Sequence, residues 1–218
     1  MLYRLWNVST RDNLNLYIFV GVLVLVGAIF GAMLVNALTL QQQQELADTL
    51  GVYMAFVKNP DALSPASTLW ESFRFYAKWL ILIWFLGITV IGVPFVLVLD
   101  FLKGVLIGFA VAVLAQQFAW NGVFFFFAAT APQNAIVVPA LMMASVSSAR
   151  FAYFVVKERL FRRNGRLLPP FLAHTAITGL LLVVLALASL FEAYVTPHLL
   201  ERFTVAGIGL DFSSLSAK

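Results

Sequence analysis

The stretch that decides the fold is YAKWLILIWFLGITVIGVPFVLVLDFLKGVLIGFAVAVLAQQFAW, which occupies residues 76–120. It is almost continuously apolar, and a helix that crosses the hydrocarbon core of a bilayer needs about 20 apolar residues. The stretch is therefore too long for one membrane span and has the right length for two. We expect spans at about residues 76–97 and 100–120, joined by a turn between Gly92 and Lys103.

The composition of the whole chain agrees with a polytopic membrane protein. Of 218 residues, 62% are hydrophobic and 11% are charged, whereas soluble globular domains are about 45–50% apolar and about 25% charged. So few polar residues could not cover the surface of a soluble sphere, which argues against a water-soluble enzyme. Intrinsic disorder is excluded because it requires low hydrophobicity. The chain has no cysteine, so disulfides, thiol nucleophiles and cysteine-ligated metals are excluded.

Three further apolar segments complete the predicted bundle. Residues 16–38 contain no charged side chain, and we interpret them as a first span that is an uncleaved signal anchor. Residues 122–156 are too long for one span, and the proline-glutamine-asparagine string 132–134 lies inside them. We interpret 122–130 as a half-helix or re-entrant piece that is broken at this string and followed by one span. The last span covers about residues 171–194.

The basic residues set the predicted orientation. The loop at 157–168 carries five basic side chains against one acid, and Arg4 and Arg11 precede the first span. Lysine and arginine are enriched in cytoplasmic loops, so we expect both segments in the cytoplasm. An even number of spans must then separate them, which requires residues 122–156 to cross once. We therefore expect a single integral membrane domain, residues 1–218, with about five spans, the N-terminus inside and the C-terminus outside.

The outer loop at residues 39–75 is more polar than the spans. Apolar residues recur in it at roughly helical spacing after the glutamine tract 41–44: Leu46, Leu50, Tyr53, Met54 and Val57. This pattern predicts a short amphipathic helix that lies on the membrane or on a partner. A solvated connector with one packed face and a dedicated partner site both fit the pattern.

Polar groups at membrane depth are the candidate functional residues, because burying them costs free energy. Asp100 and Lys103 are three residues apart and could pair on one helix face, either as a proton or ion relay or at the cytoplasmic end of a hairpin. Glu192 lies near the outer end of the last span. It could be solvated there, or it could face the bundle, where it would pair with an arginine or cap the broken helix. We expect His174 at the membrane interface.

The sharpest candidate is the string Pro132, Gln133 and Asn134. Proline breaks a helix and frees carbonyl groups, and the two amide side chains that follow could satisfy the freed backbone. Broken helices at membrane depth persist where they face protein or a water-filled cavity, and in transporters such breaks build substrate sites. The break therefore fits either a surface shaped for a partner or a polar transport site.

Two pairs of small residues could allow close helix packing. Gly27 and Gly31 form one pair, and Gly104 and Gly108 form the other. They fit packing inside the bundle or association into a homodimer. The sequence has no Walker loop, no GxSxG or HExxH motif and no acid–histidine cluster typical of an intramembrane protease. We therefore expect no catalytic residue, metal, cofactor or nucleic-acid partner.

Eight short strings share the order and spacing of a known family. They are YIFV (17–20), GAIFGA (27–32), VNAL (35–38), WFLGI (84–88), IGVP (91–94), FLKGV (101–105), APQN (131–134) and FEAYVTP (191–197). In these strings the chain resembles the stage II sporulation protein M family over about residues 14–200, and APQN and FEAYVTP are the most specific parts. The family usually carries an aliphatic residue at the position of Asp100, whereas Lys103 matches, which weakens any family-wide role for that pair.

The resemblance implies a role that composition cannot show. Members are integral membrane proteins of endospore-forming bacteria that act in engulfment, when the mother-cell membrane migrates around the forespore. They anchor and localise two peptidoglycan-degrading partners, stage II sporulation proteins D and P, and are not hydrolases themselves. The expected function is therefore a scaffold in the mother-cell or septal membrane, surrounded by membrane lipids. Partner helices would pack on the small-residue faces. The alternative is a transporter or permease subunit with a polar site at the broken helix.

Overall fold

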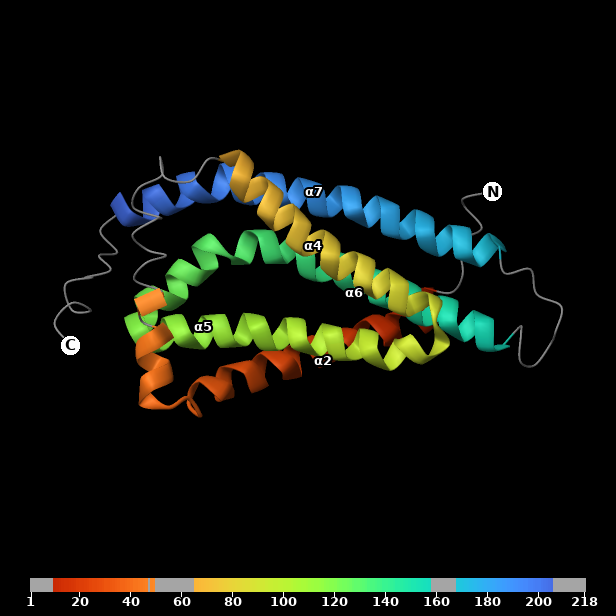
Figure 1. Cartoon of the computed structure of the whole chain (residues 1–218), viewed down its shortest axis with the longest axis horizontal. Coiled ribbons are helices and arrows are strands. Elements are labelled where there is room, and N and C mark those ends of the chain that lie inside the picture. Colours follow the sequence, from red (N-terminus) through yellow and green to blue (C-terminus); the bar gives the residue numbers. More distant parts are fainter. Residues whose placement is uncertain (1–9, 47, 50–64, 158–167, 206–218) are drawn as a thin grey trace.

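The structure is a computed structural model that describes residues 10–46, 48–49, 65–157 and 168–205. Its main elements are all helical (Figure 1): α2 (Thr10–Val35), α4 (Pro65–Ile88), the 3-10 helix η2 (Val90–Gly92), α5 (Val93–Ala129), α6 (Ala131–Val155) and α7 (Leu168–Val205). The described ranges contain no strand, so the predicted all-α class is confirmed.

Four helices are long and apolar enough to cross a membrane. They are α2 from Leu14 onward, α5, α6 and the part of α7 that ends at Thr196. The fifth long helix, α4, carries Glu71 and Arg74 in its first half and Lys78 just beyond its midpoint, and its apolar residues concentrate after them. The outward faces of the bundle are strongly apolar, as lipid contact requires. Leu25 of α2 and Leu180 of α7, for example, are 63% and 64% exposed.

The long helices alternate in direction along the long axis of the molecule (Figure 1). α2, α5 and α7 run one way, and α4 and α6 run the other. The start of α2 and the end of α6 therefore lie at one end of the bundle, and the end of α7 lies at the opposite end. The five long helices therefore follow one another in alternating directions, while the predicted number of membrane crossings, including a single crossing by residues 122–156, stays a prediction.

The turn between α4 and α5 comes earlier than the sequence prediction placed it. α4 ends at Ile88, and Thr89–Gly92 reverses the chain with a hydrogen bond from the Gly92 amide to the Thr89 carbonyl at 3.0 Å. Pro94 lies in the first turn of α5, where a missing N–H costs no helical hydrogen bond. The observed turn therefore overlaps the predicted turn region, Gly92 to Lys103, only at Gly92. Lys103 lies inside α5.

α5 is divided at Ala119, which has φ 50° and ψ −135° and is the one non-glycine residue with positive φ in the described ranges. The two parts of α5 pack on each other, because Leu114 clusters with Phe125 and Phe126. The chain thus reverses at Ala119, and residues 120–129 lead back toward α6 (Figure 1). The predicted half-helix exists, but the sharp reversal is at Ala119 and not at Pro132.

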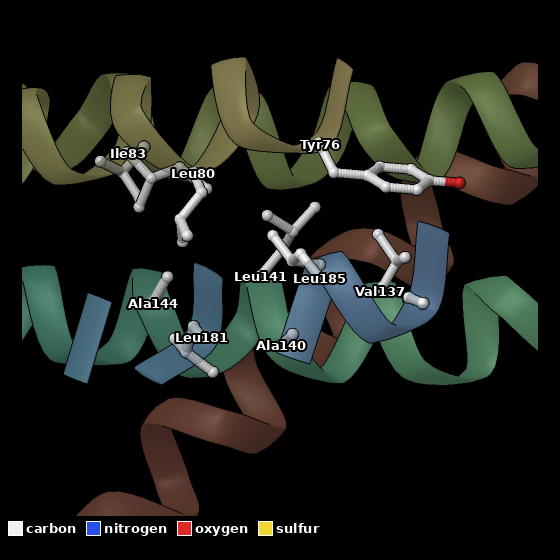
Figure 2. Close-up of a cluster of buried hydrophobic side chains, with 11 residues drawn as sticks. Tyr76, Leu80, Ile83, Val137, Ala140, Leu141, Ala144, Leu181 and Leu185 are labelled. Atoms are coloured by element: carbon white, nitrogen blue, oxygen red, sulfur yellow. The ribbon is translucent and has the colours of Figure 1, made fainter. Parts of the chain in front are cut away.

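The main core lies between α4, α6 and α7, with one residue from α5 (Figure 2). Its members recur every three or four residues on each helix, as expected for one buried stripe. They are Tyr76, Leu80 and Ile83, Val96, Val137, Ala140, Leu141 and Ala144, and Leu181, Leu185 and Ala188. The Tyr76 ring lies in this core, and its hydroxyl points away from Leu80 and Ile83 (Figure 2).

The first glycine pair brings α2 against the backbone of α5. A Cβ added at Gly27 would collide with the carbonyl of Phe101, and one added at Gly31 would collide with the carbonyl of Val105. The contact therefore requires the hydrogen side chain of glycine at both positions.

The second glycine pair makes the reciprocal contact from α5. A Cβ at Gly104 would collide with Val24, and one at Gly108 would collide with Ala28. Residue numbers rise together along the contact, so α2 and α5 are parallel. Both pairs serve internal packing, which is the first of the two predicted alternatives. A partner helix or a second copy could use these faces only if α2 left α5.

The predicted amphipathic helix of the outer loop is described only at its beginning. Residues 40–46 are helical, and Thr39 and Gln42 form a reciprocal cap. The Thr39 amide donates to Gln42 Oε1 at 3.0 Å, and the Gln42 amide donates to Thr39 Oγ1 at 3.4 Å. The apolar positions 50, 53, 54 and 57 lie outside the described residues.

We predict that Gly31→Ala destabilises the protein because its methyl group collides with the Val105 carbonyl. Overpacking of this kind costs about 1–3 kcal/mol. Gly179→Ala on α7 is the matched control, since nothing lies within 4 Å of a Cβ there. The measurement is the thermal unfolding temperature of both variants in mild detergent. Equal unfolding temperatures would contradict the close approach of α2 to α5.

Candidate functional site

Polar side chains from four helices meet inside the bundle. Tyr76 comes from α4, Asp100 and Lys103 from α5, Ser145 from α6 and Glu192 from α7; we call these five residues the polar cluster. Asp100 is 2% exposed and Lys103 is 8% exposed. Charged groups buried this deeply in a membrane bundle are expensive and are the first place to look for function.

Tyr76 and Glu192 link α4 to α7. The Tyr76 hydroxyl donates to Glu192 Oε2 at 2.8 Å, and a hydrogen bond to an ionised acceptor is stronger than a neutral one. Glu192 thus faces the bundle, as one of the sequence alternatives proposed. Its partner is a tyrosine, however, and neither an arginine nor the broken helix.

Lys103 is enclosed by aromatic rings and a carboxylate. Its Nζ lies 5.8 Å from the ring centroids of both Phe75 and Tyr76, within the range at which a cation is attracted to a ring face. Glu192 interacts electrostatically with the same ammonium group. The Lys103 side chain is therefore directed toward α4 and α7.

Asp100 is directed toward α6 instead. The Ser145 hydroxyl donates to Asp100 Oδ1 at 2.9 Å, while Asp100 Oδ2 is buried without a hydrogen-bond partner. The pairing with Lys103 suggested by the sequence is not formed, since Asp100 bonds Ser145 of α6 and the Lys103 ammonium lies against the rings of Phe75 and Tyr76. Neither residue lies at a hairpin end, since α5 continues on both sides of them.

The helical structure near Pro132 is interrupted only at Thr130, between the end of α5 and the start of α6. α6 begins at Ala131, with Pro132 in its first turn, and Asn134 Nδ2 donates to the Thr130 carbonyl at 3.1 Å. The same carbonyl also accepts the Asn134 backbone amide at 3.1 Å, so it is not one that Pro132 frees, and the expectation that amide side chains satisfy the freed backbone stays a prediction. Gln133 is buried, and its Oε1 has no hydrogen-bond partner.

A second polar contact, Ser147 with His174, was not predicted from the sequence. Ser147 Oγ and His174 Nδ1 are 2.8 Å apart, and the imidazole stacks on Phe151 with ring centroids 5.6 Å apart. His174 is 2% exposed and therefore faces the bundle interior, while its expected depth at the membrane interface stays a prediction. The signal that could have found the contact is the serine-rich string 145–148, since serines in membrane helices bond across helices.

The geometry around Ser147 is that of an interhelical link. A serine beside a histidine can act as a nucleophile with its base, but acyl transfer also needs donors aimed at an oxyanion. Ser147 lies inside α6, where backbone N–H groups serve the helix itself. The adjacent Ser148 donates to the Ile83 carbonyl at 3.2 Å, and Trp84 donates to Thr175 at 3.3 Å. These bonds tie α4, α6 and α7 together.

We predict that Tyr76→Phe lowers the free energy of unfolding by about 1–2 kcal/mol, because the Glu192 carboxylate loses its hydroxyl donor inside the bundle. The control is Tyr194→Phe, which removes a hydroxyl from a side chain that is 52% exposed. Chemical unfolding in detergent measures both variants. If Tyr76→Phe is as stable as the control, the hydrogen bond contributes nothing to the bundle.

Comparison with known proteins shows to which family the chain belongs. No curated protein and no solved structure matches the chain. The family model described as Stage II sporulation protein M matches residues 20–197. This range starts in α2, contains the whole polar cluster and both glycine pairs, and ends just after Glu192 in α7. Because the match covers most of the 218 residues, the chain belongs to the Stage II sporulation protein M family.

Proposed function

We propose that this protein is a membrane scaffold of the engulfment machinery in sporulating bacteria. It anchors peptidoglycan-degrading partners, stage II sporulation proteins D and P, at the septal membrane of the mother cell, and it carries out no catalysis itself. The observation that carries the proposal is the match of the family model to residues 20–197. The four long apolar helices support its placement in a membrane.

The proposed orientation has the N-terminus in the cytoplasm and the C-terminus outside. It is supported by the helix directions, which bring the start of α2 and the end of α6 to the same end of the bundle. The sequence at that end is rich in basic residues, namely Arg4 before α2, Arg11 in the first turn of α2, and the five basic residues of the loop at 157–168. Basic segments favour the cytoplasmic side.

The partner surface is proposed at the opposite, outer end, because peptidoglycan lies outside the cytoplasmic membrane. This end carries the helical residues 40–46 and the reversal at Ala119 (Figure 1). Leu40 is 79% exposed at the start of the short helix. An apolar side chain that is this exposed beside a bundle end is suited to contact with another protein or with lipid.

We predict that the tagged protein retains stage II sporulation proteins D and P when it is purified from sporulating cells in mild detergent. Leu40→Glu is expected to reduce retention, because it places a charge on the outer end. Leu168→Glu is the matched control, since Leu168 is a 69% exposed leucine at the start of α7 on the inner end. The proposal fails if neither hydrolase is retained and deletion of the protein leaves engulfment normal.

A transporter or permease subunit is the second candidate. The observation in its favour is Gln133, whose buried Oε1 lacks a hydrogen bond beside the break. Against it, the Asn134 side-chain amide is already bonded to the Thr130 carbonyl at the start of its own helix. It therefore does not offer a free polar group to a solute. A solute that raised the unfolding temperature of the unmodified protein, and had no effect on Gln133→Leu, would favour transport over scaffolding.

A further inference from the structure

The formal charges of the polar cluster do not balance. The cluster contains the Asp100 and Glu192 carboxylates but only one base, Lys103. Lys103 is directed toward the rings of Phe75 and Tyr76 and interacts electrostatically with Glu192, not with Asp100. Asp100 is left with a hydrogen bond from the neutral Ser145 hydroxyl. An isolated ionised carboxylate in a low-dielectric interior is too costly to persist without a compensating charge.

Other ionisable groups on the packed helices interact with residues other than Asp100. Tyr76 of α4 donates to Glu192, and His174 of α7 bonds Ser147. Arg150 of α6 interacts electrostatically with Tyr17 of α2, and its Nη2 is buried without a hydrogen-bond partner. In the described part of the chain, therefore, the positive charge that Asp100 requires does not come from a neighbouring side chain.

The unsatisfied atom is well defined. Asp100 is 2% exposed and Ser145 is 1% exposed. Oδ1 accepts the Ser145 hydrogen bond at 2.9 Å, whereas Oδ2 is buried and has no hydrogen-bond partner. A buried carboxylate oxygen with free lone pairs, next to a hydroxyl oxygen, is an acceptor site for a positive charge.

We propose that the Asp100 carboxyl group, held between α5 and α6 by the Ser145 hydroxyl, is a binding site for one monovalent cation. A proton satisfies it with the fewest ligands, since it converts the carboxylate into a carboxylic acid and requires no further oxygen. The proton comes from water, and no other bond changes. The site goes beyond the proposed scaffold role and does not depend on it.

Occupancy of this site is coupled to the packing of α5 on α6. When the cation leaves, the ionised carboxylate remains buried between the two helices, and the folded bundle loses stability. For a proton, stability is full at low pH and is lost as the pH rises through the range in which the unfolded chain has released the proton but the folded bundle still holds it. For an alkali ion, stability depends on the salt supplied.

The experiment compares the unmodified protein with Asp100→Asn, whose amide is neutral at every pH. Unfolding temperatures are measured in mild detergent from pH 5 to 9 in choline chloride, sodium chloride and potassium chloride. We expect the unmodified protein to lose about 3 °C or more as the pH rises, relative to Asp100→Asn. His174 and the other ionisable groups are present in both proteins. Their contribution to the pH dependence therefore drops out of the difference in unfolding temperature between the unmodified protein and Asp100→Asn.

Glu71→Gln is the matched control, since it removes an acid from an exposed position on α4. It is expected to keep the pH profile of the unmodified protein. Infrared spectra identify the cation: a protonated-carboxyl stretch that is absent in Asp100→Asn shows a proton. Stabilisation by sodium or potassium without that band shows an alkali ion, and the site stands with that occupant.

Identical pH and salt profiles for the unmodified protein and Asp100→Asn would overturn the proposal. If Asp100→Asn does not fold, Ser145→Ala decides instead. It removes the donor to Oδ1 and leaves the carboxyl group in place, so the midpoint of the pH-dependent loss is expected at higher pH. An unchanged midpoint in Ser145→Ala would then overturn the proposal. Loss of hydrolase binding has no bearing on either result, so the two proposals fail separately.

Discussion

A bilayer offers no hydrogen-bond partner to a polar side chain, and this constraint organises the bundle. Each helix turns an apolar face outward, and the polar groups meet at a few interior points. Tyr76 bonds Glu192, Ser145 bonds Asp100 and Ser147 contacts His174. Every one of these contacts joins two different helices. The polar groups thus fix which helices are neighbours and at what register, a specificity that apolar packing alone supplies poorly in lipid.

α5 connects the parts of the molecule. Along one helix it contributes Val96 to the main core, Asp100 and Lys103 to the polar cluster, and then the glycines that contact α2. The side chains near Lys103 require α4 and α7 close by, and the bare backbone at Gly104 requires α2 close by. Because α5 contacts α2 as well as α4 and α7, α2 packs as part of the same bundle.

The sequence predicted the all-α class and the long apolar helices, because apolar runs of span length are unambiguous. The positions of turns and of side-chain contacts needed the structure. An alanine carries no sign that it will adopt a positive φ, so the reversal at Ala119 was missed. Asp100 was assigned a neighbour on its own helix, and the contact between Ser147 and His174 was not predicted, because contacts between distant helices leave no pattern in a single sequence. The glycine pairs were found, but only the structure decided between internal packing and self-association.

The proposed role of holding other proteins at the wall side of a membrane depends on which end of the bundle faces outward. Since the chain has no cysteine, single cysteines report this directly. Asn164→Cys lies in the basic loop and Ser216→Cys lies near the C-terminus. Labelling of intact cells with a membrane-impermeant maleimide should modify Ser216→Cys and spare Asn164→Cys until the cells are permeabilised. Labelling of Asn164→Cys in intact cells, with Ser216→Cys protected, would contradict the proposed orientation and the outer partner surface that follows from it.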